Sequence, residues 1–287
     1  MRCFFLFIIL CPLFLMSQSL SKQRVDKLKR CVGRITIEGS NTSGTGFYIS
    51  GEGNVLTCWH VISDAVKMDS LGHVRLVENI FIEFANGEKR ELLIPSNFFR
   101  YPDLNQNAVS YDFCVLTQAR MLHKKCDSLK LGEFSNIQEG DEIYTAGYPL
   151  GIPNQFISKG ILSTKYVDST LMYSSKANGV KSNIKREVAL LDLTINKGNS
   201  GGPIVKLGKT PNEDLVIGIA DFQLNPFAGS AAEINDILGK QEYMLPYKDS
   251  TKISLSHILK TFSGAVIYSS NGISGCVSID HFLRATR

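Results

Sequence analysis

The sequence predicts an all-β protein, folded as a sandwich or a barrel. Short segments alternate apolar and polar residues with a period of two, as residues 32–37 do. Turn residues separate these segments, and Asn86-Gly87 between residues 80–84 and 90–94 is typical of a hairpin. Helical periodicity is largely confined to the last quarter of the chain. Many short strands with turns between them favour an all-β architecture over an alternating α/β one.

The expected elements follow one another along the chain. Residues 127–140 are expected to connect two β halves. Apolar stripes at helical spacing predict helices in 231–238 and 255–262, with a loop at 244–246 between them. The expected strands are residues 32–37, 46–50, 55–58, 80–84, 90–94, 113–116, 142–148, 156–162, 188–191, 204–205, 215–219 and 275–279.

The composition is that of an ordinary globular protein. The 287 residues, 44% of them hydrophobic, suffice for one large core or two modest ones. The formal net charge of +4 is small and its basic residues are not clustered, so no nucleic-acid partner is expected. Gly44-Thr45-Gly46 does not fit a nucleotide-binding loop, because Ile49 stands where the third glycine of that motif would be.

Residues 1–19 are expected to be a secretory signal peptide. Basic Arg2 precedes the apolar residues 3–16, and the small residues Ser17 and Ser19 follow. This apolar run is shorter than the roughly 20 residues that span a bilayer. The sequence therefore predicts an extracytoplasmic location, periplasmic or secreted, with no membrane span after signal removal. A retained N-terminal membrane anchor is the alternative.

Five cysteines remain after residue 19, an odd number without the short spacing of a zinc site. We expect them to be buried small apolar side chains, with at most two disulfides. No metal site and no cofactor are expected.

The segment 196–203, Asn-Lys-Gly-Asn-Ser-Gly-Gly-Pro, carries the clearest chemical signal. A serine hydroxyl becomes a nucleophile when a base removes its proton and the backbone exposes it to a carbonyl carbon. The glycines beside Ser200 permit such a turn and allow backbone N–H groups to converge on an oxyanion. A glycine-rich surface turn with an incidental serine is the alternative.

A base and a carboxylate are then required. Among the five histidines, His60 ends an expected strand at the rim of a β layer. Asp112 directly precedes the buried strand 113–116, where partial desolvation would let it hold a histidine tautomer; Asp103, in a polar loop, is a rival. Taken singly, a rim histidine is more often structural, and an aspartate before a strand more often forms a turn.

Several motifs together carry a family resemblance. They resemble trypsin-like serine proteases of the HtrA/DegP type, and they occur in the family's order. Residues 275–279 and 281–283 resemble the family's last strand and closing helix. The motifs are Ser43-Gly44-Thr45-Gly46-Phe47, Leu56-Thr57-Cys58-Trp59-His60-Val61, Asp112-Phe113-Cys114-Val115-Leu116, Ala146-Gly147-Tyr148-Pro149-Leu150-Gly151 and Gly198-Asn199-Ser200-Gly201-Gly202-Pro203.

The resemblance implies two six-stranded Greek-key β-barrels, as in chymotrypsin, with an active site in the cleft between them. Residues 20–135 would form the barrel that carries His60 and Asp112, and residues 136–287 the barrel that carries Ser200. Ser200 would be the nucleophile, His60 the base and Asp112 its orienting carboxylate. The N–H groups of Gly198 and Ser200 would form the oxyanion hole.

The resemblance also predicts the substrate pocket, and the C-terminal part of the chain departs from the family in two ways. The resemblance places Thr194 near the pocket base, which predicts a small or apolar substrate side chain rather than Lys or Arg. Ile219, Ala220 and Asp221 are the other expected substrate-binding residues. With 87 residues after Ser200, the PDZ domain common in this family is not expected. Residues 221–272 are expected to be an insert; it either covers, shapes or occludes the pocket or is a surface excursion without such a role.

Two functions follow as hypotheses. The first is an exported serine endopeptidase that acts through an acyl-enzyme and needs no cofactor. Its protein or peptide substrate would lie as an extended strand along the edge of residues 215–219. The second is a protease-like peptide-binding module whose cleft is closed or inactive. The sequence does not fix the oligomeric state.

Overall fold

The structure, a computed structural model, describes residues 19–68, 74–95, 111–120, 125–168, 172–174, 181–183, 185–223, 244–246, 252–254, 257 and 273–286. Its first barrel is closed and antiparallel, with strand order β1-β2-β3-β8-β7-β6. Alternating burial along β6 shows one face of that strand turned to the core, as its apolar–polar pattern predicts. The strands are β1 Val32–Ile37, β2 Ser43–Tyr48, β3 Val55–Thr57, β6 Ile80–Phe84, β7 Lys89–Leu93 and β8 Cys114–Gln118.

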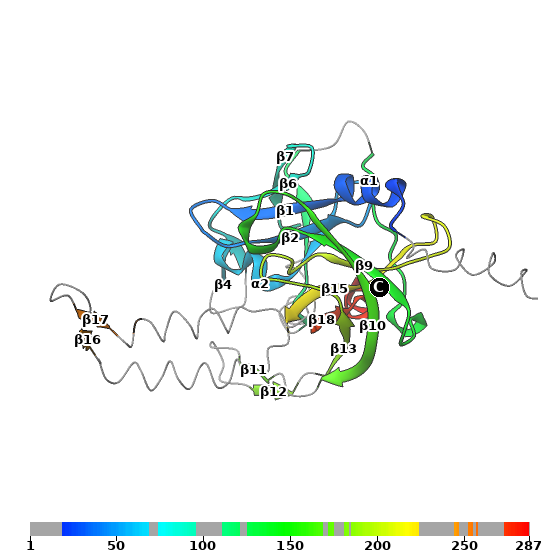
Figure 1. The fold of residues 1–287 in the computed structure, drawn as a ribbon. Helices are drawn as coiled ribbons and strands as arrows, with labels where there is room; N and C mark the ends of the chain where they lie inside the picture. Colours follow the sequence, from blue (N-terminus) through cyan, green and yellow to red (C-terminus); the bar gives the residue numbers. More distant parts are fainter. Residues whose placement is uncertain are drawn as a thin grey trace, which may run out of the picture.

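The second barrel is also closed, in the order β10-β13-β18-β15-β14-β9. Figure 1 shows it, green to red, below the blue and cyan first barrel. Two closed six-stranded antiparallel barrels confirm the fold class that the sequence and the resemblance predict. The strands are β9 Glu142–Gly147, β10 Phe156–Asp168, β13 Arg186–Asp192, β14 Pro203–Lys206, β15 Leu215–Gln223 and β18 Ile273–Ser278.

Some expected boundaries and elements differ from the structure. Met244–Pro246 is not a loop but the strand β16, which pairs with β17, Lys252–Ser254. The strand expected at 215–219 continues as β15 to Gln223, into the predicted insert, because β18 pairs with that continuation. The helix expected at 231–238 and, apart from residue 257, the one at 255–262 lie outside the described residues, as do residues 1–18.

The remaining short elements lie around the barrels. Two further two-stranded sheets, β4 with β5 and β11 with β12, stand apart from the barrel strands. These elements are β4 Val66–Met68, β5 Val74–Leu76, β11 Met172–Ser174, β12 Lys181–Asn183, α1 Lys22–Cys31, α2 Trp59–Ile62, η1 Ser63–Ala65, η2 Phe134–Asn136, η3 Pro149–Gly151 and α6 Ile279–Thr286.

The apolar core is continuous across the junction of the barrels. One cluster of buried residues fills the first barrel and includes Ala146, Val216 and Ile219 from the second. A separate cluster fills the interior of the second barrel. Of the five described cysteines, all are free and four are buried, which confirms for those four the expectation of small apolar side chains. In the described part of the chain, no helix has the length and apolar character needed to cross a membrane.

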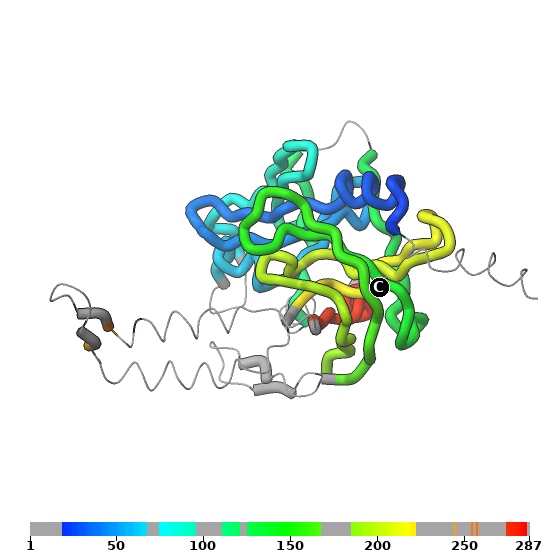
Figure 2. The backbone as a smooth tube through the Cα atoms, viewed as in Figure 1, coloured from blue at the N-terminus to red at the C-terminus, as the bar shows by residue number. Residues whose placement is uncertain are grey.

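Helix α1, which the sequence analysis did not predict, joins the two barrels. Ser21 caps it by accepting a hydrogen bond from Arg24 N at 3.4 Å. Its buried Leu28 and Cys31 pack into the core of the first barrel. In Figure 2 the blue α1 lies near the tip of the yellow β14–β15 hairpin of the second barrel.

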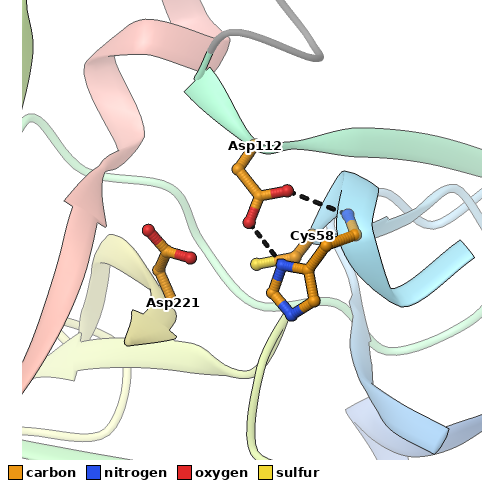
Figure 3. A group of neighbouring side chains, drawn as sticks. Cys58, Asp112 and Asp221 are labelled. Atoms are coloured by element: carbon orange, nitrogen blue, oxygen red, sulfur yellow. Dashed lines mark hydrogen bonds and ion pairs between the residues drawn. The ribbon is translucent and has the colours of Figure 1, made fainter. Parts of the chain in front are cut away.

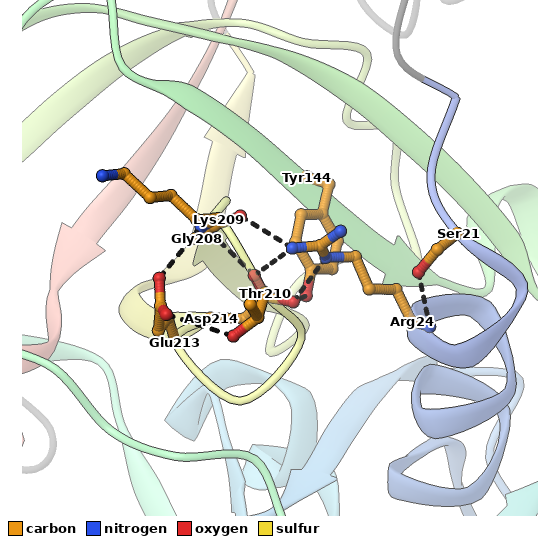
Figure 4. Close-up of polar contacts among 8 residues, drawn as sticks. All are labelled: Ser21, Arg24, Tyr144, Gly208, Lys209, Thr210, Glu213 and Asp214. Carbon is orange, nitrogen blue, oxygen red and sulfur yellow. Dashed lines mark hydrogen bonds and ion pairs between the residues drawn. The ribbon is translucent and has the colours of Figure 1, made fainter.

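A buried ion pair makes the contact between α1 and that hairpin (Figure 4). Arg24 donates from Nε to Asp214 Oδ2 at 2.8 Å and from Nη2 to Asp214 Oδ1 at 3.1 Å. Tyr144 OH donates to Asp214 Oδ2 at 2.8 Å, and Gly208 N donates to Oδ1 at 2.7 Å. Because the side chains of Arg24 and Asp214 are only 11% and 6% exposed, loss of either leaves a nearly buried charge without its partner.

Substitution of Arg24 is therefore expected to weaken the junction. Arg24→Gln should lower the free energy of unfolding by about 2–4 kcal/mol, because Asp214 stays buried without its cation. Arg30→Gln on the same helix is the matched control. Its pair with Asp127 is more than half exposed, so it should cost less than about 1 kcal/mol. Urea unfolding measures both, and equal losses would contradict this account.

Candidate active site

The glycine-rich turn that carries Ser200 connects β13 to β14 and is pressed against the first barrel. Gly198 and Gly201 adopt positive φ, +100° and +86°. A Cβ on Gly201 would lie 2.2 Å from Thr45 O and 2.3 Å from Thr57 Oγ1. Both the backbone conformation and the close approach of the first barrel therefore require glycine at 201.

Thr45 of β2 holds this turn in place. Its backbone N donates to Ser200 O at 2.8 Å, and its Oγ1 donates to Gly198 O at 2.7 Å. Thr57 Oγ1 in turn donates to Thr45 O at 2.7 Å. The two hydroxyl bonds are buried, and together with the backbone bond they fix the position of Ser200 through a strand of the other barrel.

Two peptide N–H groups of the turn, those of Gly198 and Ser200, are the predicted oxyanion hole, and they point away from the protein groups that bind their peptide carbonyls. Lys197 O accepts from Leu150 N, and Asn199 O accepts from Gly202 N. Because C=O and N–H point in opposite directions across a trans peptide, the N–H groups of Gly198 and Ser200 face away from those partners. Across the described residues, neither N–H donates to another protein group. Two such donors near the nucleophile suit an oxyanion.

His60 and Asp112 meet at the mouth of the first barrel. His60 lies in α2, directly after β3, as its sequence context predicts. His60 Nδ1 is 2.6 Å from Asp112 Oδ2, and His60 N donates to Asp112 Oδ1 at 2.9 Å. The side chain of His60 is 49% exposed, whereas that of Asp112 is 14% exposed. The buried carboxylate therefore holds the ring at Nδ1, while about half of the His60 side chain stays exposed to solvent.

Each partner shifts the other's pKa toward the charged pair. Burial alone would raise the pKa of the Asp112 carboxyl, but the hydrogen bond and charge of His60 outweigh it and lower that pKa. Burial alone would lower the pKa of His60, but the bond and charge of Asp112, and the charge of Asp221, raise it above its usual value. This is the electrostatic state of a carboxylate that stabilises an imidazolium.

The closing helix α6 fixes the backbone around Asp112, which has a positive φ of 56°. Tyr111 stacks on His281 with ring centroids 4.1 Å apart, and Phe113 meets Phe282 edge-on at 5.7 Å. His281 Nε2 accepts from Glu187 N at 2.8 Å, and burial lowers its pKa to about 4, so the ring is neutral at pH 7. The residues on both sides of Asp112 are thus held by one helix.

Ser200 is linked to the His60–Asp112 pair by a contact with Asp221. Ser200 Oγ lies 3.4 Å from the Asp221 carbonyl oxygen, and this is its hydrogen bond in the described part of the chain; none joins it to His60. Figure 3 shows the Asp221 carboxyl turned toward Asp112 and the imidazole ring. Polar atoms of Cys58, His60, Asp112 and Asp221 all lie within 4.8 Å of one another. The predicted base, carboxylate and nucleophile therefore come together from three distant segments.

The same four residues are types that can bind a metal ion, but their ligand atoms are already engaged. Cys58 Sγ contacts Ala220 O at 3.4 Å, and burial raises the pKa of this thiol well above its usual value. His60 Nδ1 is occupied by Asp112, and Asp221 Oδ2 lies 3.1 Å from Arg186 Nη1. A metal ion would have to displace these partners and ionise a buried thiol. We therefore interpret the group as a hydrogen-bonded network.

The four predicted substrate-binding residues occupy different environments. Thr194 is exposed between buried Leu193 and Ile195, which both hydrogen-bond to Ser274 Oγ of β18. Ile219 and Ala220 are buried, and the backbone N and O of Ala220 are taken by the serine turn. Asp221 turns its side chain toward the His60–Asp112 pair. The preference for a small or apolar substrate side chain stays a prediction.

The expected substrate edge is wrong. Residues 215–219 pair along their length with β14, Pro203–Lys206. On the other side, Val216 exchanges backbone hydrogen bonds with Lys130 and Gly132, and β18 pairs from Gly218 onward. Closure of the barrel thus occupies both edges. Among the described residues, the unpaired edge of β15 is at residues 222–223, opposite β18.

A cavity of about 450 Å³ adjoins the serine turn. Leu150, in η3, is 62% exposed there and has a positive φ of 57°. The cavity thus combines an exposed leucine in a strained backbone conformation with Gly198 of the serine turn. The lining residues are Asn41, Ser43, Leu150, Gly151, Lys197 and Gly198.

Comparison with known proteins decides the family. The description "trypsin-like peptidase domain" fits residues 44–211, which is more than half of the chain. The chain belongs to the trypsin-like peptidase family. Within this family it is similar to HtrA proteins: human serine protease HTRA4 is 28% identical over 165 residues, covering 58% of this chain and 28% of that protein. Putative protease Do-like 14 of Arabidopsis thaliana is 30% identical over 166 residues, covering 57% and 33%.

Solved trypsin-like structures agree in fold. An HtrA-type protease with tripeptide has a TM-score of 0.50 and 18% identity, covering 92% of this chain and 62% of that one. The active form of the Rv3671c protease from M. tuberculosis also has a TM-score of 0.50, with 19% identity and coverage of 70% and 74%. The chain spans about a third or less of the length of the curated relatives. These findings place the chain in the trypsin-like peptidase family, with HtrA proteins among its relatives and the same fold in the solved structures.

Sequence reasoning missed several groups of this trypsin-like site. Thr45 was visible only as part of a Gly-Thr-Gly motif, and nothing in the sequence linked it to Ser200. The role of α6 beside Asp112 left no local signal. Asp221 did leave one, since it is a lone carboxylate in the apolar run of β15, but the sequence assigned it to substrate binding.

Gly201→Ala is expected to destroy the serine turn. The new Cβ would clash with backbone and side-chain oxygens, in addition to the strain of a positive φ. Gly87→Ala is the matched control, because φ there is +81° and nothing lies within 4 Å of the added Cβ. The control should lose only about 1–2 kcal/mol in stability. Gly201→Ala should lose more, measured by urea unfolding; equal losses would show that Thr45 and Thr57 do not crowd the turn.

Proposed function

We propose that this protein is an exported serine endopeptidase that cleaves peptide bonds through an acyl-enzyme, with Ser200, His60 and Asp112 as its triad. The observation that carries the proposal is the 2.6 Å contact between His60 Nδ1 and Asp112 Oδ2 at the corner where Ser200 is held. Membership of a protease family supports it.

The proposed reaction uses only groups of this chain. His60 Nε2 takes the hydroxyl proton as Ser200 Oγ bonds to the substrate carbonyl carbon. The oxyanion is stabilised by the N–H groups of Gly198 and Ser200. As the C–N bond breaks, His60 returns the proton to the leaving amine. Water then attacks the acyl-enzyme, again losing its proton to His60, which releases the acid and restores Ser200. Asp112 stays ionised throughout and holds Nδ1–H.

The substrate we propose is a protein or peptide bound in an extended conformation. Residues 222–223 of β15 offer it an unpaired strand edge next to Asp221, whose carbonyl contacts Ser200. The cavity lined by Leu150 would receive residues on the other side of the scissile bond. The solved HtrA-type protease that carries a tripeptide supports a peptide ligand.

A protease-like peptide-binding module is the second candidate. It is favoured by the hydrogen bond of Ser200 Oγ, which goes to Asp221 O at 3.4 Å rather than to His60. In the endopeptidase this contact must be exchanged for one to His60 when substrate binds, a tightening that catalytic sites without substrate commonly need.

Export is part of the proposal. Its support is the charged, apolar and small-residue order of residues 1–19, which lie outside the described residues except for residue 19. The location would be periplasmic or secreted.

A fluorophosphonate probe is expected to label Ser200. Ser200→Ala should abolish the label and lower kcat by about 10⁴–10⁶-fold, because no other group forms the acyl-enzyme. Ser40→Ala, a change at a partly exposed serine bonded to Asp64, should leave both unchanged. Peptide digests followed by mass spectrometry measure turnover. Binding of peptides without labelling or cleavage would favour the binding module.

Asp112→Asn is expected to lower kcat by about 10⁴-fold while the fold persists. Asparagine tolerates the positive φ at this position, so the backbone is kept. Its amide would donate to His60 Nδ1 and so favour the wrong tautomer. Asp127→Asn, at an exposed aspartate paired with Arg30, is the control and should keep full activity. Equal activity of the two variants in an ester-hydrolysis assay would remove Asp112 from the triad.

A further inference from the structure

We propose that Asp221 is a positioning residue of the triad: it shares one proton with Asp112, is anchored by Arg186, and sets the pH at which His60 becomes a base. The kinetic consequences of this inference rest on the proposed function, whereas the geometry that supports it is independent of that function.

A bulge in β15 places Asp221 beside the triad. The pairing of β15 with β18 shifts register between Ala220 and Phe222, so that Asp221 falls at the irregularity. Its carboxyl, 10% exposed, faces Asp112 and His60, with polar atoms of the three within 4.8 Å of one another (Figure 3).

Two carboxyl groups this close share a proton rather than both ionise. Burial and the charge of Asp112 raise the pKa of Asp221 to about 7, although Arg186 lowers it. Asp112 keeps a lowered pKa because His60 stabilises its charge. Below pH 7, Asp221 is therefore the protonated partner and donates to Asp112. With Asp221 protonated, Asp112 carries the only negative charge of the two carboxyl groups, and it is stabilised by hydrogen bonds from His60 and from Asp221.

Arg186 of β13 anchors Asp221 from behind. Its Nη1 lies 3.1 Å from Asp221 Oδ2, and both side chains are about nine-tenths buried. Its Nε is buried without a hydrogen-bond partner among the described residues, whereas its Nη1 has the Asp221 carboxyl as partner. The ionisable groups around the Asp221 carboxyl, taken over all packed elements, are Asp112 before β8, His60 and Cys58 at the β3–α2 junction, Arg186 on β13 and Cys276 on β18.

The sign of the effect on His60 follows from charge. Ionised Asp221 stabilises the imidazolium and raises the pKa of His60. Asparagine at 221 removes this charge but keeps an N–H donor for Asp112. His60 should then lose its proton at lower pH, and the acid limb of kcat/KM should move down by about 0.5–1 pH unit. The plateau kcat should change less than about threefold.

Alanine at 221 separates positioning from charge. Asp221→Ala loses the donor to Asp112 as well, so kcat should fall about tenfold or more while KM stays within about twofold. Asp221→Asn should therefore keep the kcat that Asp221→Ala loses, a difference that a purely structural role would not predict. Asp214→Asn is the matched control: it changes another buried carboxyl of the second barrel, paired with Arg24, and should leave the pH profile in place.

The test that does not depend on turnover is the NMR titration of His60. It uses the Ser200→Ala protein with and without Asp221→Asn, and His60→Gln assigns the signal. The His60 pKa should fall by about 0.5–1 unit with Asp221→Asn and stay constant with Asp214→Asn. An unchanged His60 pKa overturns the inference, even in an active protease. A shifted pKa in a protein that neither labels nor cleaves supports it and rejects only the endopeptidase.

A second measurement needs no variant. Infrared spectra of the native protein should show a protonated carboxyl band at pH 6 that disappears as pH rises through about 7, where Asp221 ionises. Ordinary carboxyl groups are already ionised at pH 6, so the band isolates the shared proton. Absence of this band at pH 6 would also overturn the inference, whether or not Asp221→Asn folds.

Discussion

The structure depends on the close contact between β2 of the first barrel and the serine turn of the second. Thr45 donates to the carbonyls of Gly198 and Ser200, and Gly201 permits the approach because it has no side chain. These bonds are buried, so separating the barrels would leave several polar groups without partners. Ser200 therefore takes its position from the barrel that also carries His60 and Asp112, and this arrangement forms only when both barrels have folded against each other.

The two terminal helices reinforce this junction from opposite ends of the described chain. Helix α1 packs on the first barrel and extends Arg24 to Asp214 of the second. Helix α6 follows the last strand of the second barrel and stacks His281 on Tyr111, next to Asp112. Both helices thus connect one barrel to the other through a few polar or aromatic contacts. The rigidity of the His60–Asp112 pair is a property of these distant segments as much as of the pair itself.

The site combines familiar trypsin-like geometry with an additional buried carboxyl. Asp221 brings a second acid to within reach of Asp112, where desolvation and like charge make full ionisation unfavourable. Arg186 offsets part of that cost. The resulting group of one base, two carboxyls and one guanidinium responds to pH as a unit. The match to the trypsin-like peptidase domain establishes the family and the two closed barrels establish the fold, while this electrostatic arrangement belongs to the residues of this chain.

The sequence by itself predicted the barrel strands and a glycine-rich turn at Ser200, because period-two patterning and glycine spacing are local properties of the chain. The resemblance of its motifs to a known family added His60 and Asp112 as partners of Ser200, and the structure showed that position 201 requires glycine. The tertiary structure decided that β15 has no free edge at 215–219, since barrel closure is set by long-range pairing. It likewise decided that Asp221 faces Asp112: the direction of a side chain at a bulge depends on the register between strands about 50 residues apart, which no local pattern encodes.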